Sequence, residues 1–117
     1  MAQFDELIHQ PVRLRIMAAL MTLDSDTRIS FNALKAVLKV TDGNLGGHLF
    51  KLEKARYVLV EKTLVHNKPQ TFIALTAHGR MAFAEHIAAL QQILQPSVPL
   101  TPVAPPATEE VRPPVTP

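Results

Sequence analysis

The sequence predicts a mostly helical domain with one β-hairpin over residues 1–94, followed by a disordered extension over residues 95–117. Three observations predict this division. Apolar residues recur at helical spacing in four segments, and a stretch rich in Val, Leu, Tyr and Thr lies before the last of them. Eight of the ten prolines lie in the last 23 residues, which contain no aromatic residue. Such a segment buries too little apolar surface to offset the entropy of ordering it.

The composition excludes several classes of protein. Without cysteine, the chain forms no disulfide scaffold, thiolate zinc site, iron–sulfur cluster or cysteine nucleophile. No apolar run reaches the ~18–20 residues that a membrane span needs. The first ten residues carry two acids and no Lys or Arg, unlike the basic start of a secretory signal. We therefore expect a cytoplasmic protein that does not associate with membranes.

The net charge of +2 conceals a gradient along the chain. Residues 1–27 sum to −2, whereas residues 28–68 carry eight bases against three acids and sum to +5. A basic middle suits a polyanionic partner. The alternative is an ordinary solvated surface, and charge alone does not decide between the two.

The first helix is predicted over Pro11–Leu23, after a short helical turn from about Phe4. Proline suits the first helical position, where its missing N–H is not needed. This helix is apolar on nearly all faces, which indicates burial on more than one side and leaves room for a second subunit. A turn follows over Asp24–Thr27. Arg28–Ile29 is then too short for more than one pair of a strand ladder.

Two further helices come next. Ser30 can cap a helix over Phe31–Leu38, and Lys39–Thr41 separates it from a third helix over Gly43–Ala55. Either Thr41 or Asp42 can cap this third helix. Three leucines at positions i, i+4 and i+7 give it an inward stripe: Leu45, Leu49 and Leu52.

The β-hairpin is predicted from Tyr57–Val65 and Thr71–Leu75, joined by a polar turn over His66–Gln70. Thr76 then caps a last helix over Ala77–Leu94. Two short helices separated by a tight turn and followed by a two-stranded hairpin describe a winged helix-turn-helix.

Three runs of residues resemble a known family: HQPVRLRIMAAL, TDGNLGGHLFKLEKARYVLVEK and LTAHGRMAF. They are similar to the small winged-helix transcriptional regulators related to the MarR and ArsR groups, over about residues 4–94. The resemblance implies a homodimeric DNA-binding regulator. The sequence departs from the family pattern at two places. Gly46 and Gly47 stand where the family usually has serine and a larger residue, and Arg56 replaces a glycine. That glycine often takes the left-handed conformation, so the exit of the third helix is open to question.

The third helix is the candidate recognition helix, with one face in the core and the other toward base edges in the major groove. Asparagine can pair with adenine, and lysine can reach guanine or a phosphate. Histidine can bond a base edge or a phosphate, or simply pack at the surface. The adjacent glycines either let the DNA backbone approach closely or are neutral drift. The candidate residues are Asn44, Gly46, Gly47, His48 and Lys51.

A second set of residues is expected to contact phosphates or the minor groove. The hairpin would form a basic wing beside the recognition helix, although a solvated hairpin end explains the same residues. The candidates are Lys35, Lys39, Thr41, Lys62, His66, Asn67 and Lys68.

The last helix carries an apolar seam that we interpret as a dimer interface; packing on its own domain is the alternative. A two-fold dimer would place two recognition helices about one DNA turn apart, ~34 Å, and so predicts a palindromic site. The interface candidates are Ile8, Phe83, Ile87, Leu90 and Leu94.

No enzyme motif is found, so no catalytic residue and no cofactor is expected. His78, Glu85 and His86 fall roughly on one side of the last helix, but without cysteine or a close histidine pair we expect no metal site. The sequence therefore predicts a sequence-specific regulator of double-stranded DNA, a repressor rather than an activator, with no effector identified. The alternative is a winged-helix module that binds a protein instead, with the proline-rich tail as a ligand.

Overall fold

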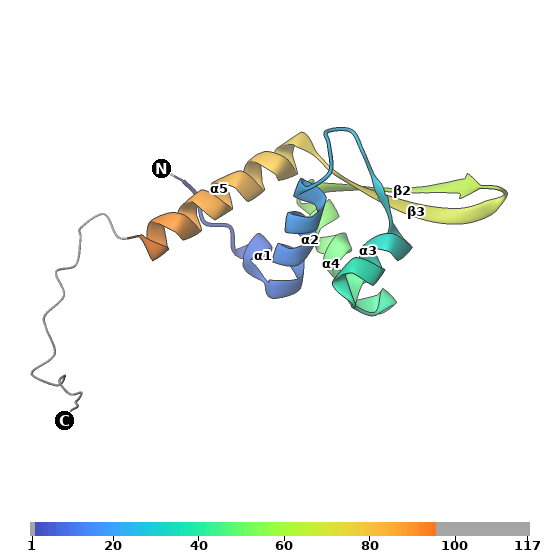
Figure 1. Cartoon of the computed structure of the whole chain (residues 1–117), viewed down its shortest axis with the longest axis horizontal. Helices are drawn as coiled ribbons and strands as arrows, with labels where there is room; N and C mark the ends of the chain where they lie inside the picture. The colour runs from blue at the N-terminus through green and yellow to red at the C-terminus, as the bar shows by residue number, and fades with distance from the viewer. Residues whose placement is uncertain (1, 96–117) are drawn as a thin grey trace, which may run out of the picture.

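The computed structural model describes residues 2–95, so the prediction of a disordered tail lies outside the described residues. The element order is that of a winged helix-turn-helix, as the sequence predicts (Figure 1). In chain order the elements are α1 (Glu6–His9), α2 (Pro11–Met21), β1 (Ile29–Ser30), α3 (Phe31–Leu38), α4 (Asp42–Lys54), β2 (Val58–Val65), β3 (Lys68–Leu75) and α5 (Ala77–Leu94). Within residues 2–95, no helix is both long and apolar enough to cross a membrane.

Helix α2 is the central element of the fold. It contacts α1, α3, α4, α5 and β3, and Ile16, Met17 and Leu20 are fully buried. The apolar residues on its several faces are therefore covered largely by other elements of the same chain. A second subunit is not needed to explain them, contrary to the interpretation of the sequence.

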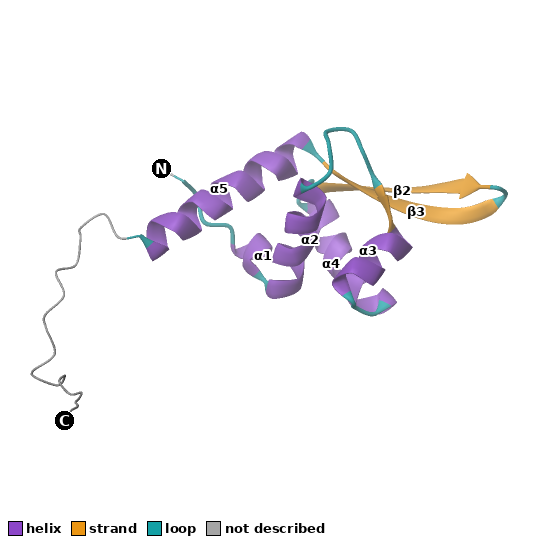
Figure 2. Ribbon diagram, viewed as in Figure 1, coloured by secondary structure: helices purple, strands orange, loops and turns teal. Residues whose placement is uncertain are grey.

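The sheet has the antiparallel order β1-β3-β2. The short strand β1 pairs Ile29 with Ile73 and Ser30 with Phe72, one pair more than predicted. We call β2, β3 and the turn between them the wing. In Figure 2 the wing and α5 extend from the helical body in opposite directions.

The predicted turn of the wing is wrong in length. His66 and Asn67 both have positive φ angles, 52° and 65°, which close the hairpin in two residues as in a type I′ turn. Lys68 already pairs with Val65, so β3 begins three residues earlier than the sequence predicts. Pro69 is tolerated because it lies beyond the short β1 strand, where β3 has a neighbour on one side only.

The end of α4 resolves the question raised by Arg56. This residue has a φ of 66°, and its N–H donates to the carbonyl of Glu53 over 2.9 Å. The N–H of Tyr57 donates to the carbonyl of Leu52 over 3.0 Å. This pair of hydrogen bonds is the Schellman helix ending, normally closed by glycine. The helix therefore ends as it would with glycine, at a cost of about 1 kcal/mol for the arginine.

The start of α5 is fastened to the end of α4. The Thr76 hydroxyl accepts from the N–H of Gly79 over 2.8 Å and donates to the carbonyl of Arg56 over 2.7 Å. Its backbone N–H donates to the carbonyl of Tyr57 over 3.0 Å. Arg80 donates to the carbonyl of Leu23 over 3.3 Å. The segment Thr76–Arg80 thus fixes α5, the wing and α4 to one another.

Candidate nucleic-acid interface

Helix α4 is held by caps at both ends of the tight turn that precedes it. Lys39 ends α3 in the left-handed region, with a φ of 57°, and its N–H donates to the carbonyl of Lys35 over 2.8 Å. Thr41 then caps α4, because its hydroxyl accepts from the N–H of Asn44 over 3.1 Å. Of the two caps left open by the sequence, the structure uses Thr41.

The two faces of α4 differ as a recognition helix requires. The predicted stripe of Leu45, Leu49 and Leu52 is buried. The opposite side is exposed, and we call it the outward face. It consists of Gly43, Asn44, Gly47, Phe50, Lys51 and Lys54.

Two of the candidate residues flank the outward face and are half-buried, Gly46 on one side and His48 on the other. Arg13 of α2 donates from Nη1 to Nδ1 of His48 over 3.1 Å. An arginine has no acceptor, so His48 accepts at Nδ1 and carries its proton on Nε2. Burial and the charges of Arg13 and Lys51 lower the pKa of His48. At neutral pH this imidazole is therefore a neutral donor and not a cation.

The three glycines of α4 lie in open space. Apart from its chain neighbours and the backbone of α4 itself, a Cβ atom added to Gly43, Gly46 or Gly47 would meet no atom of residues 2–95 within 4 Å. Packing within this chain therefore does not require glycine at any of these positions, although each glycine lowers helix stability by about 1 kcal/mol relative to alanine.

The lysines predicted to contact phosphates are placed differently from one another. Lys39 and Lys68 are exposed, as are His66 and Asn67 at the tip of the wing. Lys35 instead forms an ion pair of 2.5 Å with Asp42, so part of its charge is neutralised.

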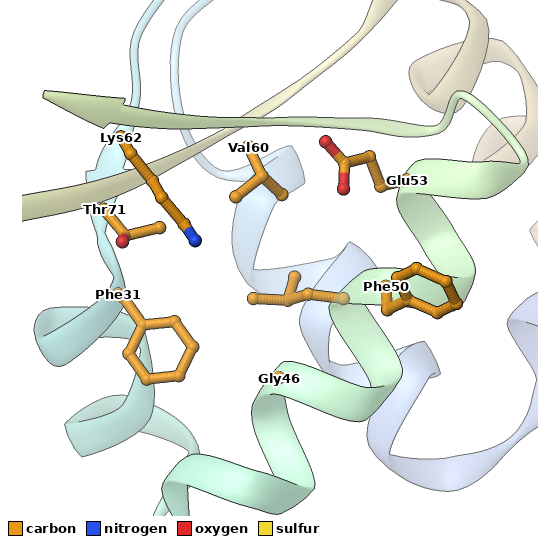
Figure 3. A pocket seen from close by; sticks show the side chains of 8 residues that line it. Phe31, Gly46, Phe50, Glu53, Val60, Lys62 and Thr71 are labelled. Carbon is orange, nitrogen blue, oxygen red and sulfur yellow. The ribbon is translucent and has the colours of Figure 1, made fainter.

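Lys62 lies on β2, below the tip of the wing, and its side chain faces α4. It lines a groove of about 330 Å³ together with Phe31 of α3, Val60 of β2, and Gly46 and Phe50 of α4. Figure 3 shows its side chain reaching from β2 toward the space between Phe31 and α4.

Reasoning from the sequence missed three residues of the outward face: Gly43, Phe50 and Lys54. Phe50 is 60% exposed, and Lys54 places its ammonium 5.7 Å from the centroid of the Phe50 ring. The signal was present, because Phe50 does not belong to the leucine stripe of α4 and interrupts an otherwise polar face.

The residues predicted to form the dimer interface, Ile8 of α1 and four residues of α5, divide between the core and the surface. Ile8 is fully buried and Phe83 is 8% exposed, so both belong to the core of this chain and are unavailable to a second copy. Ile87 and Leu90 are half-buried, and Leu94 is 76% exposed. The structure adds two exposed apolar side chains on the same helix, Met81 and Ile93.

The histidines and acid weighed as metal ligands have other contacts. The ring of His78 packs on Tyr57, Glu85 accepts from the N–H of Gln3 over 3.0 Å, and His86 is buried. Among residues 2–95, no three His, Cys, Asp or Glu side chains gather closely enough to hold a metal ion.

Comparison with known families agrees with this geometry. The model of the winged helix DNA-binding domain matches residues 12–94. The chain belongs to this winged-helix family. The match spans α2 to α5, and therefore includes α4 and the whole wing.

Individual winged-helix relatives are similar over most of the chain. An uncharacterized protein of Methanocaldococcus jannaschii is 36% identical over 88 residues, which cover 75% of this chain and 92% of the relative. A transcriptional regulator homologue from Pyrococcus horikoshii OT3 has 27% identity and a TM-score of 0.69, covering 77% of this chain and 86% of that one. A MarR-family structure from Porphyromonas gingivalis W83, at 13% identity, shares the fold with a TM-score of 0.59, covering 78% of this chain and 85% of that one. The resemblance to small winged-helix regulators is thereby confirmed.

Proposed function

We propose that this protein is a homodimeric transcriptional regulator that binds a specific sequence in double-stranded DNA and acts as a repressor. Helix α4 enters the major groove, and the wing lies along the flanking backbone or minor groove. The observation that carries the proposal is the outward face of α4, which is exposed on a helix anchored by three buried leucines.

The outward face and its flank offer the groups that read base edges. Asn44 can make a bidentate contact with adenine, and Lys51 can reach the acceptors of guanine or a phosphate. His48, neutral and carrying its proton on Nε2, would donate to an acceptor such as N7 of a purine. The open space at Gly46 and Gly47 would let the DNA backbone approach α4 closely.

Exposed cations on several elements would bind the phosphates on either side of the reading helix. Lys51 and Lys54 lie on α4, Lys39 on the preceding turn, and Lys68 beside the tip of the wing. Strands of eight residues span about 26 Å at ~3.3 Å per residue, enough for the tip to reach beyond the groove that α4 occupies. Phosphate contacts of this kind release counterions, so binding would weaken steeply with added salt.

The second half of α5 is the surface we propose for the dimer. Ile93 and Leu94 are 63% and 76% exposed, and Leu90 and Ile87 precede them on the same helix. Apolar contact between two copies would cover these side chains. A two-fold dimer requires a palindromic site with half-sites about one DNA turn apart. We propose repression because occupation of such a site excludes other proteins from it.

The experiment is a binding titration of the full chain against genomic fragments and a random duplex, at several salt concentrations. We expect at least one fragment to bind more tightly than random duplex, with affinity falling as salt rises. Lys51→Gln should weaken binding and reduce the salt slope by about one. Ser25→Glu changes the net charge equally on an exposed loop away from α4 and is the matched control.

Two results would overturn the proposal. If no fragment binds more tightly than random duplex, sequence-specific binding fails and the protein-interaction module becomes the better account. If affinity does not respond to salt, the phosphate contacts fail. Lys62→Glu with Lys68→Glu separates the two functions, since it should abolish DNA binding but leave a protein partner largely unaffected.

A further inference from the structure

Phe50 is an apolar side chain on a face of α4 that otherwise presents glycines and polar groups. It is 60% exposed, although α4 already has its complete buried stripe of leucines. Gly46 and Gly47 lie one turn earlier, where a helical side chain covers the surface, and neither position carries a side chain. The ring therefore stands free on the outward face, at the edge of the groove shown in Figure 3.

The charges around Phe50 fit a position deep in a groove of DNA. Lys51 is its neighbour in the chain, and the Lys54 ammonium lies 5.7 Å from the ring centroid. Two cations beside one aromatic ring would bind the phosphates of the groove walls while the ring points to the floor between them. A wholly apolar protein surface packed against this face would bury both ammonium groups without counter-charges, which is unfavourable.

The floor of the major groove offers one apolar group to such a ring. Guanine, adenine and cytosine present only hydrogen-bond donors and acceptors there, whereas thymine presents its 5-methyl group. We propose that Phe50 determines specificity by packing against the 5-methyl group of a thymine in each half-site. This inference rests on the proposed function, because it assumes that α4 enters the major groove.

The test replaces each thymine of a selected duplex by deoxyuridine, which lacks only the 5-methyl group. Burial of one methyl group changes a dissociation constant by about fourfold. We expect the full chain to bind about fourfold more weakly when the contacted thymine is replaced. Replacing any other thymine should leave the affinity unchanged. Phe50→Ala should weaken binding to the thymine duplex and remove the difference between thymine and deoxyuridine.

Two further variants serve as controls. Phe50→Leu keeps an apolar side chain and should retain part of the sensitivity to the methyl group. Met81→Ala shortens a side chain that is 69% exposed on α5, far from the outward face, and should leave the sensitivity unchanged. Because Phe50 is largely exposed, its replacement should not unfold the domain, which circular dichroism of each variant checks.

The outcomes separate the inference from the function on which it rests. A chain that prefers no duplex over random DNA overturns both. A chain that prefers a duplex, but is indifferent to deoxyuridine at every position or selects half-sites without thymine, overturns the role of Phe50 and leaves the function standing. The role of Phe50 is also overturned if Phe50→Ala retains the full sensitivity, since another group must then contact the methyl.

Discussion

The backbone of Gly79 packs directly against the carbonyl group of Tyr57. A Cβ atom on residue 79 would overlap the carbonyl oxygen and lie 2.8 Å from the carbonyl carbon. This is where the first turn of α5 meets the end of α4 and the start of the wing. Position 79 therefore needs glycine for space, whereas the three glycines of α4 do not.

Gly79→Ala should lower the free energy of unfolding by about 1–3 kcal/mol, because α5 must move away from the Tyr57 backbone. Gly43→Ala is the matched control, since a Cβ atom there meets nothing within 4 Å. Urea denaturation of the two variants checks this. Equal stability of both would contradict the contact between α5 and Tyr57.

Gly47→Ala should separate stability from DNA binding. Alanine should raise the free energy of unfolding by about 0.5–1 kcal/mol, because glycine is unfavourable within a helix and position 47 is open. The same variant should bind DNA more weakly if the DNA backbone approaches this position. Denaturation and DNA titration of one sample measure both effects. A gain in stability without loss of affinity would make the glycine neutral drift.

A buried histidine of α5, His86, pairs with the exposed His9 of α1. The N–H of Asp5 donates to Nδ1 of His86 over 3.0 Å, so the proton of His86 lies on Nε2, which faces Nδ1 of His9 at 3.2 Å. The Phe4 ring covers both imidazoles, and the Tyr57 hydroxyl donates to the Asp5 carboxylate. Both nitrogens of His86 are thus engaged in a site that favours its neutral form.

Burial, followed by the charge of His9, lowers the pKa of His86 below its usual 6.5. The folded state then binds fewer protons than the unfolded state at acidic pH. The stability contributed by neutral His86 is complete above about pH 6.5 and is lost as the pH falls below it. His86→Gln should flatten this dependence, and His66→Gln at the exposed wing tip should not. Denaturation between pH 5 and 8 checks it; an equal slope in all three chains would contradict it.

Leu94→Glu should convert the proposed dimer to a monomer, because it would place a charge on each copy within the apolar contact. Leu59→Glu changes a side chain that is 50% exposed on β2, outside the proposed contact, and is the control. Sedimentation equilibrium at micromolar concentration distinguishes the two states. A wild type that is monomeric under these conditions would contradict the proposed dimer.

Much of the fold could be predicted because its signals are local. Ser30 and Thr76 cap the helices that the sequence assigns to them, Thr41 is one of the two caps that the sequence allows for α4, and the leucine stripe of α4 is buried as predicted. The turn of the wing was mispredicted because Lys68 and Pro69 are typical of a loop. The left-handed conformations of His66 and Asn67, which close the turn in two residues, are not a signal that these residue types give strongly.

The candidate site was harder to predict because it depends on contacts between distant residues. Arg13 and His48 lie 35 positions apart, and only their hydrogen bond shows that the histidine is a neutral donor. The helical spacing of the apolar residues in α5 identified an apolar face, but not which residues cover that face. Phe83 belongs to the core and Leu94 to the surface, although they share one seam.

Because the natural chain contains no cysteine, a single introduced thiol can carry an iron chelate that cleaves nearby DNA. The decisive measurement places the chelate at Glu53→Cys, an exposed position on the flank of α4, or at Gln92→Cys on α5 as the control. If α4 enters the major groove of a specific site, Glu53→Cys will cleave within both half-sites, about one DNA turn apart, and Gln92→Cys will not. Equal or unlocalised cleavage from the two positions would contradict the account.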